Sequence, residues 1–255
     1  MPDAVAVIPE DASEELSMNQ YSRRDVIRTA AAVAAAPIVI STLASGTAMA
    51  QQAPSVVAPQ HTSRPLPYAA GALKGLSERL IQSHWENNYG GSVRALNVVK
   101  QRLAEAMAVT DFPAYIYNDL KREHLLRTGS VIMHELYFEN LGGSGTAGAD
   151  VRAKLSGSFG SFDAWEAEYR RIGAGLGGGS GWVLLALNRH SGLLENYWLA
   201  DHAHSPPHAT PLLVMDMYEH SYQMDYGAAA ARYIDAFFDN INWEIVSRRL
   251  EPAAA

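Results

Sequence analysis

Apolar residues recur at helical spacing over two long stretches of the chain between residues 64 and 145. In the first stretch, residues 77–108, they fall near one face of a helix, although Gly90-Gly91 is a weak point within it. A proline-containing break at residues 111–113 interrupts the pattern, and a second helical stretch covers residues 114–140. Two long helices joined by a short break predict an α-helical hairpin.

The pattern changes after a glycine-rich turn at residues 141–145. Short amphipathic stretches then predict four helices, and three runs of apolar residues predict strands. The expected helices cover residues 149–155, 162–176, 232–238 and 243–250, and the expected strands cover residues 182–187, 193–199 and 211–215. The first two strands are joined by a turn and form a β-hairpin. We therefore expect an α+β protein, with a helical-hairpin domain at residues 64–145 and an α/β domain at residues 146–255.

The first 50 residues have the features of an export signal rather than those of a folded domain. Ser22-Arg23-Arg24-Asp25-Val26-Ile27 is a twin-arginine pattern, an alanine-rich apolar run covers residues 29–43, and Ala48-Met49-Ala50 is a cleavage site. The alternative is a membrane anchor, but the apolar run is short for a membrane span and ends in small residues. We expect a Tat signal peptide at residues 1–50 and a flexible leader at residues 51–63. Such a protein is exported folded and works in the periplasm or outside the cell.

The composition excludes several kinds of chemistry. The 255 residues include no cysteine, which rules out disulfides, thiolate metal sites and cysteine nucleophiles. The net charge of −7 argues against a nucleic-acid surface. The sequence also lacks internal repeats, a glycine-rich phosphate loop and the G-x-S-x-G motif.

Asp216 and His220 are the first candidates for metal binding. Asp216 follows an apolar strand, and His220 stands four residues later in a stretch compatible with a helix. If a helical turn begins at Asp216, both side chains lie on the same side of it. For this spacing alone, a helix-capping aspartate and a surface histidine are the simpler interpretation.

Two further histidines change that interpretation. His84 and His134 lie in apolar stretches, one on each helix of the expected hairpin. A single histidine on such a face is usually structural, but here two of them precede an aspartate and a third histidine. Three imidazoles and one carboxylate suit iron, manganese or zinc and leave a coordination position open. The set therefore indicates a redox or Lewis-acid metal site rather than a closed structural one.

Five short segments match one family pattern over about residues 65–250. The most specific segment is Asp216-Met217-Tyr218-Glu219-His220-Ser221-Tyr222, which fits the motif D-x-[WYF]-E-H-[AS]-Y. The other four are Pro65-Leu66-Pro67-Tyr68, His134-Glu135-Leu136-Tyr137-Phe138, Gly179-Ser180-Gly181-Trp182 and Asn240-Ile241-Asn242-Trp243-Glu244. Together these segments resemble the iron/manganese superoxide dismutases. The resemblance implies that the sheet of the α/β domain is small, three-stranded and antiparallel.

The resemblance also implies the cofactor, the site and the partners. One iron or manganese ion per subunit would be held by His84, His134, Asp216 and His220, with Tyr137 and Trp182 lining the site. The protein would be a homodimer in which Glu219 reaches the partner's His220. The metal would oxidise one superoxide to oxygen and reduce the next to hydrogen peroxide, with uptake of two protons, and the charge of Asp216 would favour the trivalent state.

The expected partner of the metal-bound solvent is of neither common type. Most iron members of the family have a glutamine four residues before the second histidine ligand, where this chain has Ser130. The glutamine position of the manganese members falls near residues 200–202. We expect His202 to contact the solvent, with Asp201 as the alternative. The sequence leaves open whether the metal is iron, manganese or either of them.

Several positions along the expected access route differ from the family pattern. Ser92 replaces the gateway tyrosine, Asn88 replaces a histidine, and Gln223 replaces the tyrosine that meets this histidine across the dimer. Asn87 and Ala230 stand where the family has a lysine and an arginine, although Arg232 lies two residues after Ala230. Because cationic groups speed the capture of an anion such as superoxide, we expect an intact metal set with altered access, steering and proton delivery.

Two alternatives to a dismutase stay open from the sequence. The altered access route favours a catalytically weak or inactive metal-binding protein of the same fold, and a loop with His202, His204 and His208 would offer it an accessory metal site. A metal-dependent hydrolase or oxygenase has less support, because the chain has no H-E-x-x-H motif. The sequence does not distinguish a dimer from a tetramer, and it does not indicate the turnover rate.

Overall fold

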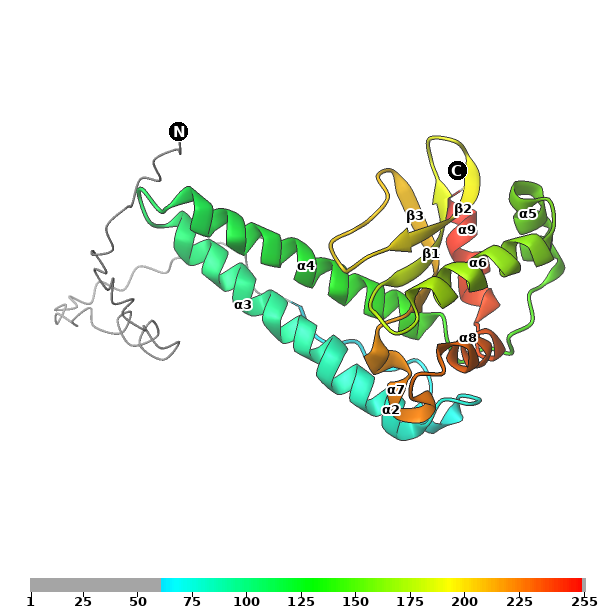
Figure 1. Cartoon of the computed structure of the whole chain (residues 1–255). Coiled ribbons are helices and arrows are strands. Elements are labelled where there is room, and N and C mark those ends of the chain that lie inside the picture. The colour runs from blue at the N-terminus through cyan, green and yellow to red at the C-terminus, as the bar shows by residue number, and fades with distance from the viewer. Residues whose placement is uncertain (1–60, 254–255) are drawn as a thin grey trace, which may run out of the picture. The chain divides into compact units, whose positions relative to one another are not determined.

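The computed structural model describes residues 61–253 (Figure 1). The expected Tat signal and residues 51–60 of the expected leader lie outside the described residues. The end of the leader is attached to the fold rather than free, because the backbone of His61 exchanges two hydrogen bonds, of 3.1 and 2.8 Å, with the side chain of Asn97. Within residues 61–253, no helix is both long enough and apolar enough to cross a membrane.

The helical hairpin has the expected place in the chain, but its first arm is not a uniform α-helix. After a short 3₁₀-helix, η1 (Ala70–Ala72), the first arm runs through α2 (Glu78–Ser83), η2 (His84–Tyr89) and α3 (Gly90–Met107). The second arm is α4 (Ala114–Glu139), which packs along α3 (Figure 1). The η2 segment is a π-helix. Such segments are rare in proteins, and those that occur are often at functional sites.

Local interactions explain where the first arm begins and where the hairpin turns. Ser77 caps α2, since its Oγ accepts a hydrogen bond of 3.1 Å from the backbone N–H of Leu80. The carboxylate of Asp225 accepts the N–H of Ser77 at 2.7 Å and so ties this end to the C-terminal half of the chain. At the far end the backbone of Asp111 has φ of 62°, and Pro113 precedes the first residue of α4. Proline at this point cannot continue the earlier helix.

The second half of the described chain contains a sheet of three antiparallel strands in the order β2-β1-β3. The strands are β1 (Trp182–Asn188), β2 (Leu193–Leu199) and β3 (Ala209–Asp216). The central strand pairs on both sides, and its first five residues are buried, which accounts for its continuous apolar run. Trp182 is opposite Leu199 on one side and opposite Asp216 on the other. The start of β1 and the ends of β2 and β3 therefore lie at the same end of the sheet.

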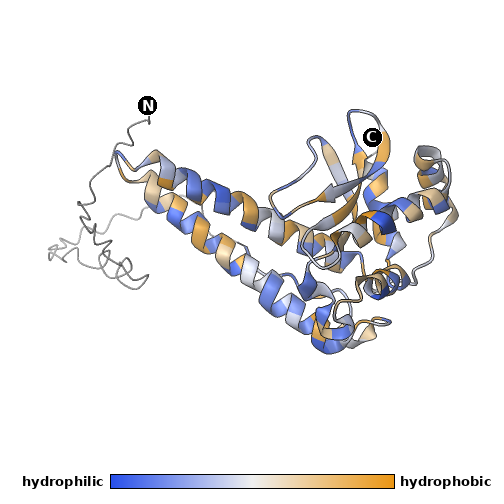
Figure 2. Cartoon of the chain, viewed as in Figure 1, coloured by the Kyte–Doolittle hydropathy of each residue, from blue (hydrophilic) through white to orange (hydrophobic). Residues whose placement is uncertain are grey.

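Four further helices pack on this sheet or beside it and complete the core. They are α5 (Ala149–Phe159), α6 (Phe162–Leu176), α8 (Ala230–Asp239) and α9 (Trp243–Ala253). Of these, α6 packs on β1 and β2, while α9 and the end of α4 pack on β3. Figure 2 shows hydrophobic residues along the strands and alternating hydrophobic and hydrophilic residues along α3 and α4. The strands β1 and β3 are largely buried, whereas the edge strand β2 is partly exposed, and each arm of the hairpin keeps a polar face.

Asn140, the residue after α4, fixes the hairpin against the outer edge of β3. Its Oδ1 accepts the N–H of Val214 at 3.0 Å, and its Nδ2 donates to the carbonyl of Leu212 at 3.3 Å. The guanidinium of Arg249 donates to the same carbonyl at 2.9 Å. These side chains satisfy backbone groups that an adjacent strand would otherwise pair with. The end of α4 is thereby held at a fixed position relative to β3.

The expected α+β fold with a small three-stranded antiparallel sheet is confirmed. The division into two domains at residues 145 and 146 stays a prediction. One local expectation was wrong, because no helical turn begins at Asp216. Asp216 is the last residue of β3, Tyr218 is extended, and the short helices η3 (Glu219–Ser221) and α7 (Gln223–Tyr226) follow.

Candidate metal centre

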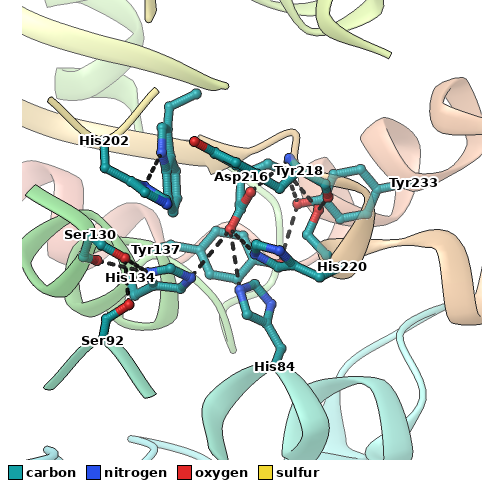
Figure 3. Close-up of polar contacts among 12 residues, drawn as sticks. His84, Ser92, Ser130, His134, Tyr137, His202, Asp216, Tyr218, His220 and Tyr233 are labelled. Carbon is teal, nitrogen blue, oxygen red and sulfur yellow. Dashed lines mark hydrogen bonds and ion pairs between the residues drawn. The ribbon is translucent and has the colours of Figure 1, made fainter. Parts of the chain in front are cut away.

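Four polar side chains converge where the hairpin meets the end of the sheet at which β3 finishes (Figure 3). The ligand atoms of His84, His134, Asp216 and His220 all lie within 4.8 Å of one another, and all but His220 are buried. The Nε2 atoms of His84 and His220 are each 3.2 Å from Oδ2 of Asp216, and that of His134 is 3.7 Å away. One carboxylate oxygen therefore lies among three imidazole nitrogens.

The hydrogen bonds of this cluster leave ring nitrogens of His84 and His134 free for a cation. Nδ1 of His134 is 2.7 Å from the backbone oxygen of Ser130, which can only accept, so Nδ1 carries the proton and Nε2 has a free lone pair. Nε2 of His134 and both ring nitrogens of His84 are buried without a hydrogen-bond partner. Although Nε2 of His84 is close to Asp216, it lacks hydrogen-bond geometry. Unpaired buried polar atoms are costly, and a metal ion at this point would satisfy those that face the carboxylate. The donor set fits iron, manganese or zinc.

Asp216 is oriented by hydrogen bonds at the end of β3. Oδ1 accepts the N–H of Tyr218 at 2.8 Å, and the backbone carbonyl accepts the hydroxyl groups of Tyr233 at 2.6 Å and Ser221 at 2.9 Å. Oδ2 is thus left facing the histidines. Burial acts to raise the pKa of Asp216, but the nearby His220 and His84 outweigh it and hold the pKa well below its usual range. The carboxylate is therefore ionised at physiological pH.

Burial also keeps the histidines inside the cluster neutral. It lowers the pKa of His84, and together with the neighbouring His84 it lowers the pKa of His134 to about 3. Neutral imidazole is the form that binds a metal. The charges needed for a cation site are therefore present, with one ionised carboxylate beside the neutral nitrogen donors of His84 and His134.

Two fully buried aromatic residues form walls of the cluster, as the resemblance implies. The ring of Tyr137 lies 5.2 Å from that of His84, and the ring of Trp182 lies 5.1 Å from that of His134, measured between centroids. The position of Trp182 follows from the sheet register, because side chains of directly opposed residues lie on the same face and Trp182 is opposite Asp216.

A polar pocket of about 460 Å³ leads to the cluster. Its lining consists of Asn87, Asn88, Gly91, Ser92, Arg127, Ser130, His134, His202, Tyr218 and His220. The pocket contains both Ser92 and Ser130, whose hydroxyl oxygens hydrogen-bond to each other at 2.7 Å. These small side chains leave the route to the metal cluster open where the family pattern has a tyrosine.

His202 lines this pocket and is held in a defined orientation. Its Nδ1 accepts a hydrogen bond of 3.0 Å from the indole N–H of Trp182, and its ring stacks on Tyr218 with centroids 4.7 Å apart. Because the indole can only donate, the neutral ring of His202 carries its proton on Nε2. Burial lowers the pKa of His202, so the ring is neutral near pH 7.

The other candidates in the loop after β2 are placed differently. Asp201 is not among the pocket residues, and its Oδ1 accepts hydrogen bonds from the backbone of Ala203 at 2.7 Å and the ring of His204 at 2.8 Å. Within residues 61–253 no second group of three potential metal ligands is present. The structure therefore does not bring His202, His204 and His208 together as an accessory metal site.

The residues expected at the dimer contact lie on the outside of the metal cluster. A second depression of about 400 Å³ is lined by Ser83, Asn88, Glu219, His220, Gln223 and Met224. Glu219 is exposed and comes directly before His220 in the sequence, but it is not one of the four candidate ligands. Of the four candidate ligands, only His220 is shared with this depression.

Gly129 is a residue of the site that the sequence pattern did not reveal. It lies in α4, and a Cβ at this position would be 1.7 Å from the backbone oxygen of His202. Only glycine permits this approach between a helix and a loop. An isolated glycine inside a helical pattern was the available signal, because such a residue often marks a close packing contact.

Comparisons with known proteins agree with this geometry. A family model for the C-terminal domain of iron/manganese superoxide dismutases matches residues 147–249. The chain is 48% identical over 190 residues to an iron superoxide dismutase of Cupriavidus metallidurans, which covers 74% of this chain and 96% of that relative. It is 35% identical over 188 residues to an iron superoxide dismutase of Aquifex aeolicus, covering 71% and 87% of the two chains. It is also 31% identical over 197 residues to a manganese superoxide dismutase of Halobacterium salinarum, covering 74% and 94%. The chain therefore belongs to the iron/manganese superoxide dismutase family.

Proposed function

We propose that this enzyme is a superoxide dismutase with one iron or manganese ion per subunit. The observation that carries the proposal is the buried cluster of His84, His134, Asp216 and His220, which opens into a polar pocket. The dismutases among its relatives, with iron or with manganese, support the same activity. When bound, the ion supplies one-electron chemistry, by which one superoxide is oxidised to oxygen and another is reduced to hydrogen peroxide.

The residues around the ion control its charge and the supply of protons. The ionised carboxylate of Asp216 favours the more highly charged state of the ion. Tyr137 and Trp182 exclude water from two sides of the cluster. Formation of peroxide needs two protons, and Nε2 of His202 is the atom that we assign to hold a proton in the pocket. The hydrogen bond from Trp182 fixes the tautomer in which Nε2 has this proton.

The alternative of a catalytically weak or inactive metal-binding protein has less support. Two relatives that cover 74% and 71% of the chain are iron superoxide dismutases. Ser92 leaves the pocket open rather than closing it, and the accessory histidine site that would favour a binding protein is not formed within residues 61–253.

Superoxide decay per bound metal ion is the measurement that tests the proposal. The purified protein would be loaded separately with iron and with manganese, and the decay of superoxide would be followed by stopped-flow absorbance. We expect rapid, metal-dependent decay with at least one of the two ions. Tight binding of both ions without faster decay would reject the dismutase and return the binding protein as the better interpretation.

We also propose that the protein is exported by the Tat pathway and works in the periplasm or outside the cell. The twin-arginine segment, the apolar run and the Ala48-Met49-Ala50 site support this location. Replacing Arg23 and Arg24 by lysine should leave the protein in the cytoplasm, which cell fractionation would detect. Unchanged export of this variant would contradict the Tat assignment.

We propose further that the protein forms a homodimer through the surface around Glu219. This surface includes the exposed side chain of Met224, and it leaves the side chain of His220 25% exposed, although His220 belongs to the metal cluster. A partner subunit over this surface would cover both groups and bring Glu219 to the partner's His220. Light scattering should therefore give twice the mass of the chain, and Glu219→Lys should weaken the dimer. A monomer at micromolar concentration would count against the proposal.

A further inference from the structure

Arg127 is a cationic residue in the wall of the pocket that leads to the metal cluster. Among residues 61–253 it is the only lysine or arginine that lines this pocket. It lies on α4, three residues before Ser130 and seven before His134, and this spacing places the three side chains along one face of the helix. Seven residues of α-helix correspond to about 10 Å along the axis, which is close to one Debye length at an ionic strength of about 0.1 M. The charge of Arg127 therefore acts on an anion that approaches the cluster.

The guanidinium is held in place but keeps donors for a ligand. Its Nε lies 3.2 Å from Oε2 of Glu123, one turn farther from the metal cluster. In the described part of the chain, no hydrogen bond or ion pair engages its two terminal nitrogens. The side chain is 36% exposed, so an anion from solvent has access to it. The planar guanidinium presents these free N–H groups to oxyanions.

The surroundings make this charge important for an anionic substrate. The whole chain has a net charge of −7, and residues 51–255, which remain after removal of the proposed signal, have a net charge of −4, so either form repels superoxide. Asn87 and Ala230 are neutral where the family pattern has cations, so neither can offset this repulsion near the pocket.

We propose that Arg127 steers superoxide into the pocket and takes the place of the cationic positions that this chain lacks. The role rests on the proposed function, and it concerns capture of the substrate rather than electron or proton transfer. It makes α4 the source of both an inner metal ligand and an outer anion-binding group. Glu123, by the same reasoning, weakens the positive potential at the entrance.

The test is the second-order rate constant for superoxide decay as a function of ionic strength. Arg127→Gln should lower this rate constant roughly three- to tenfold at low salt, with the difference shrinking as salt screens the charge. Arg127→Lys should keep most of the rate, and Glu123→Gln should raise it. Arg122→Gln is the matched control, because Arg122 lies on the same helix, is exposed, and makes no part of the pocket lining. Metal content should be equal in all four variants.

Azide binding provides a readout that does not depend on turnover. Titration of the metal-loaded proteins with azide, followed by absorbance, should show weaker binding to Arg127→Gln than to Arg122→Gln at low salt. Equal rate constants and equal azide affinities for these two variants at every ionic strength would overturn the proposal. If the wild-type protein binds metal but does not remove superoxide, the proposed function fails, and the azide comparison still decides whether Arg127 attracts anions to the site.

Discussion

Replacing Asp216 by asparagine is expected to abolish superoxide removal and to weaken metal binding by at least roughly 100-fold, more than the loss of a group that only supports a ligand. Oδ2 of Asp216 is the point on which three imidazole nitrogens converge, and it is the only charged donor among the four candidate ligands. The asparagine side chain has nearly the same shape and can keep the hydrogen bond from Tyr218. It removes the negative charge, however, and so removes the main attraction for a di- or trivalent ion. Metal content by elemental analysis and superoxide decay should both fall.

The matched control for this change is Asp163→Asn. Asp163 has a side chain that is 92% exposed, and its nearest cationic group, on Arg152, is 3.9 Å away. The same chemical substitution at this surface position should leave metal content and activity unchanged. If Asp216→Asn kept the metal and the rate of the wild-type protein, the assignment of the ligand set would be wrong.

Replacing Gly129 by alanine is expected to displace His202 and to lower the rate of superoxide removal by roughly 10- to 100-fold, the loss typical for groups that support a metal site. A Cβ at Gly129 would be 1.7 Å from the carbonyl oxygen of His202, and both atoms belong to or adjoin backbone that cannot rotate away. Either α4 or the loop must move, which costs about 1–3 kcal/mol of folding stability. Movement of the loop breaks the hydrogen bond between Trp182 and His202. The loop that contains His202 carries none of the four candidate metal ligands, so its displacement should change metal content little, while tryptophan fluorescence should report the lost contact.

Two comparisons separate this effect from a general loss of stability. Gly157→Ala changes another helical glycine, but a Cβ there meets nothing within 4 Å, so this variant should gain up to about 1 kcal/mol from helix propensity and keep full activity. In a His202→Ala background, Gly129→Ala should have little further effect on the rate, since the two residues act through one another. Additive losses in the double variant would show that Gly129 does not act through His202.

Much of the fold could be predicted from local patterns. Helix α6 begins after Ser161, whose hydroxyl oxygen accepts a capping hydrogen bond of 3.0 Å from the N–H of Ala164. It ends before Gly177. Serine before a helix and glycine after it are common boundary residues, so both ends could be predicted from the sequence. The strands were predictable because buried strands are continuous apolar runs bounded by turn residues. The π-helix that begins at His84 was not, because its residues have no composition that distinguishes them from an α-helix.

The metal centre was predictable in its ligands but not in its surroundings. Asp216 and His220 belong to a specific motif, although a strand end and a 3₁₀ turn bring them together rather than the helical turn expected from their spacing. The position of His202 depends on the close approach of its loop to Gly129, and these residues are far apart in the chain. The place of Arg127 in the pocket likewise depends on how α4 lies against the sheet. Contacts of this kind are set by the packing of distant elements, and single-sequence patterns do not contain them.

The four ligands are divided evenly between the two halves of the described chain. His84 and His134 come from the two arms of the hairpin, whereas Asp216 and His220 come from the end of β3 and the turn after it. Neither half alone can offer a complete set of donors, so capture of the ion reports that both halves have formed and have docked correctly. A bound ion in turn holds the halves together, by about 4 kcal/mol when free metal is 1,000 times its dissociation constant. A subunit that contains its ion is therefore one in which both halves have folded and have docked in the correct arrangement.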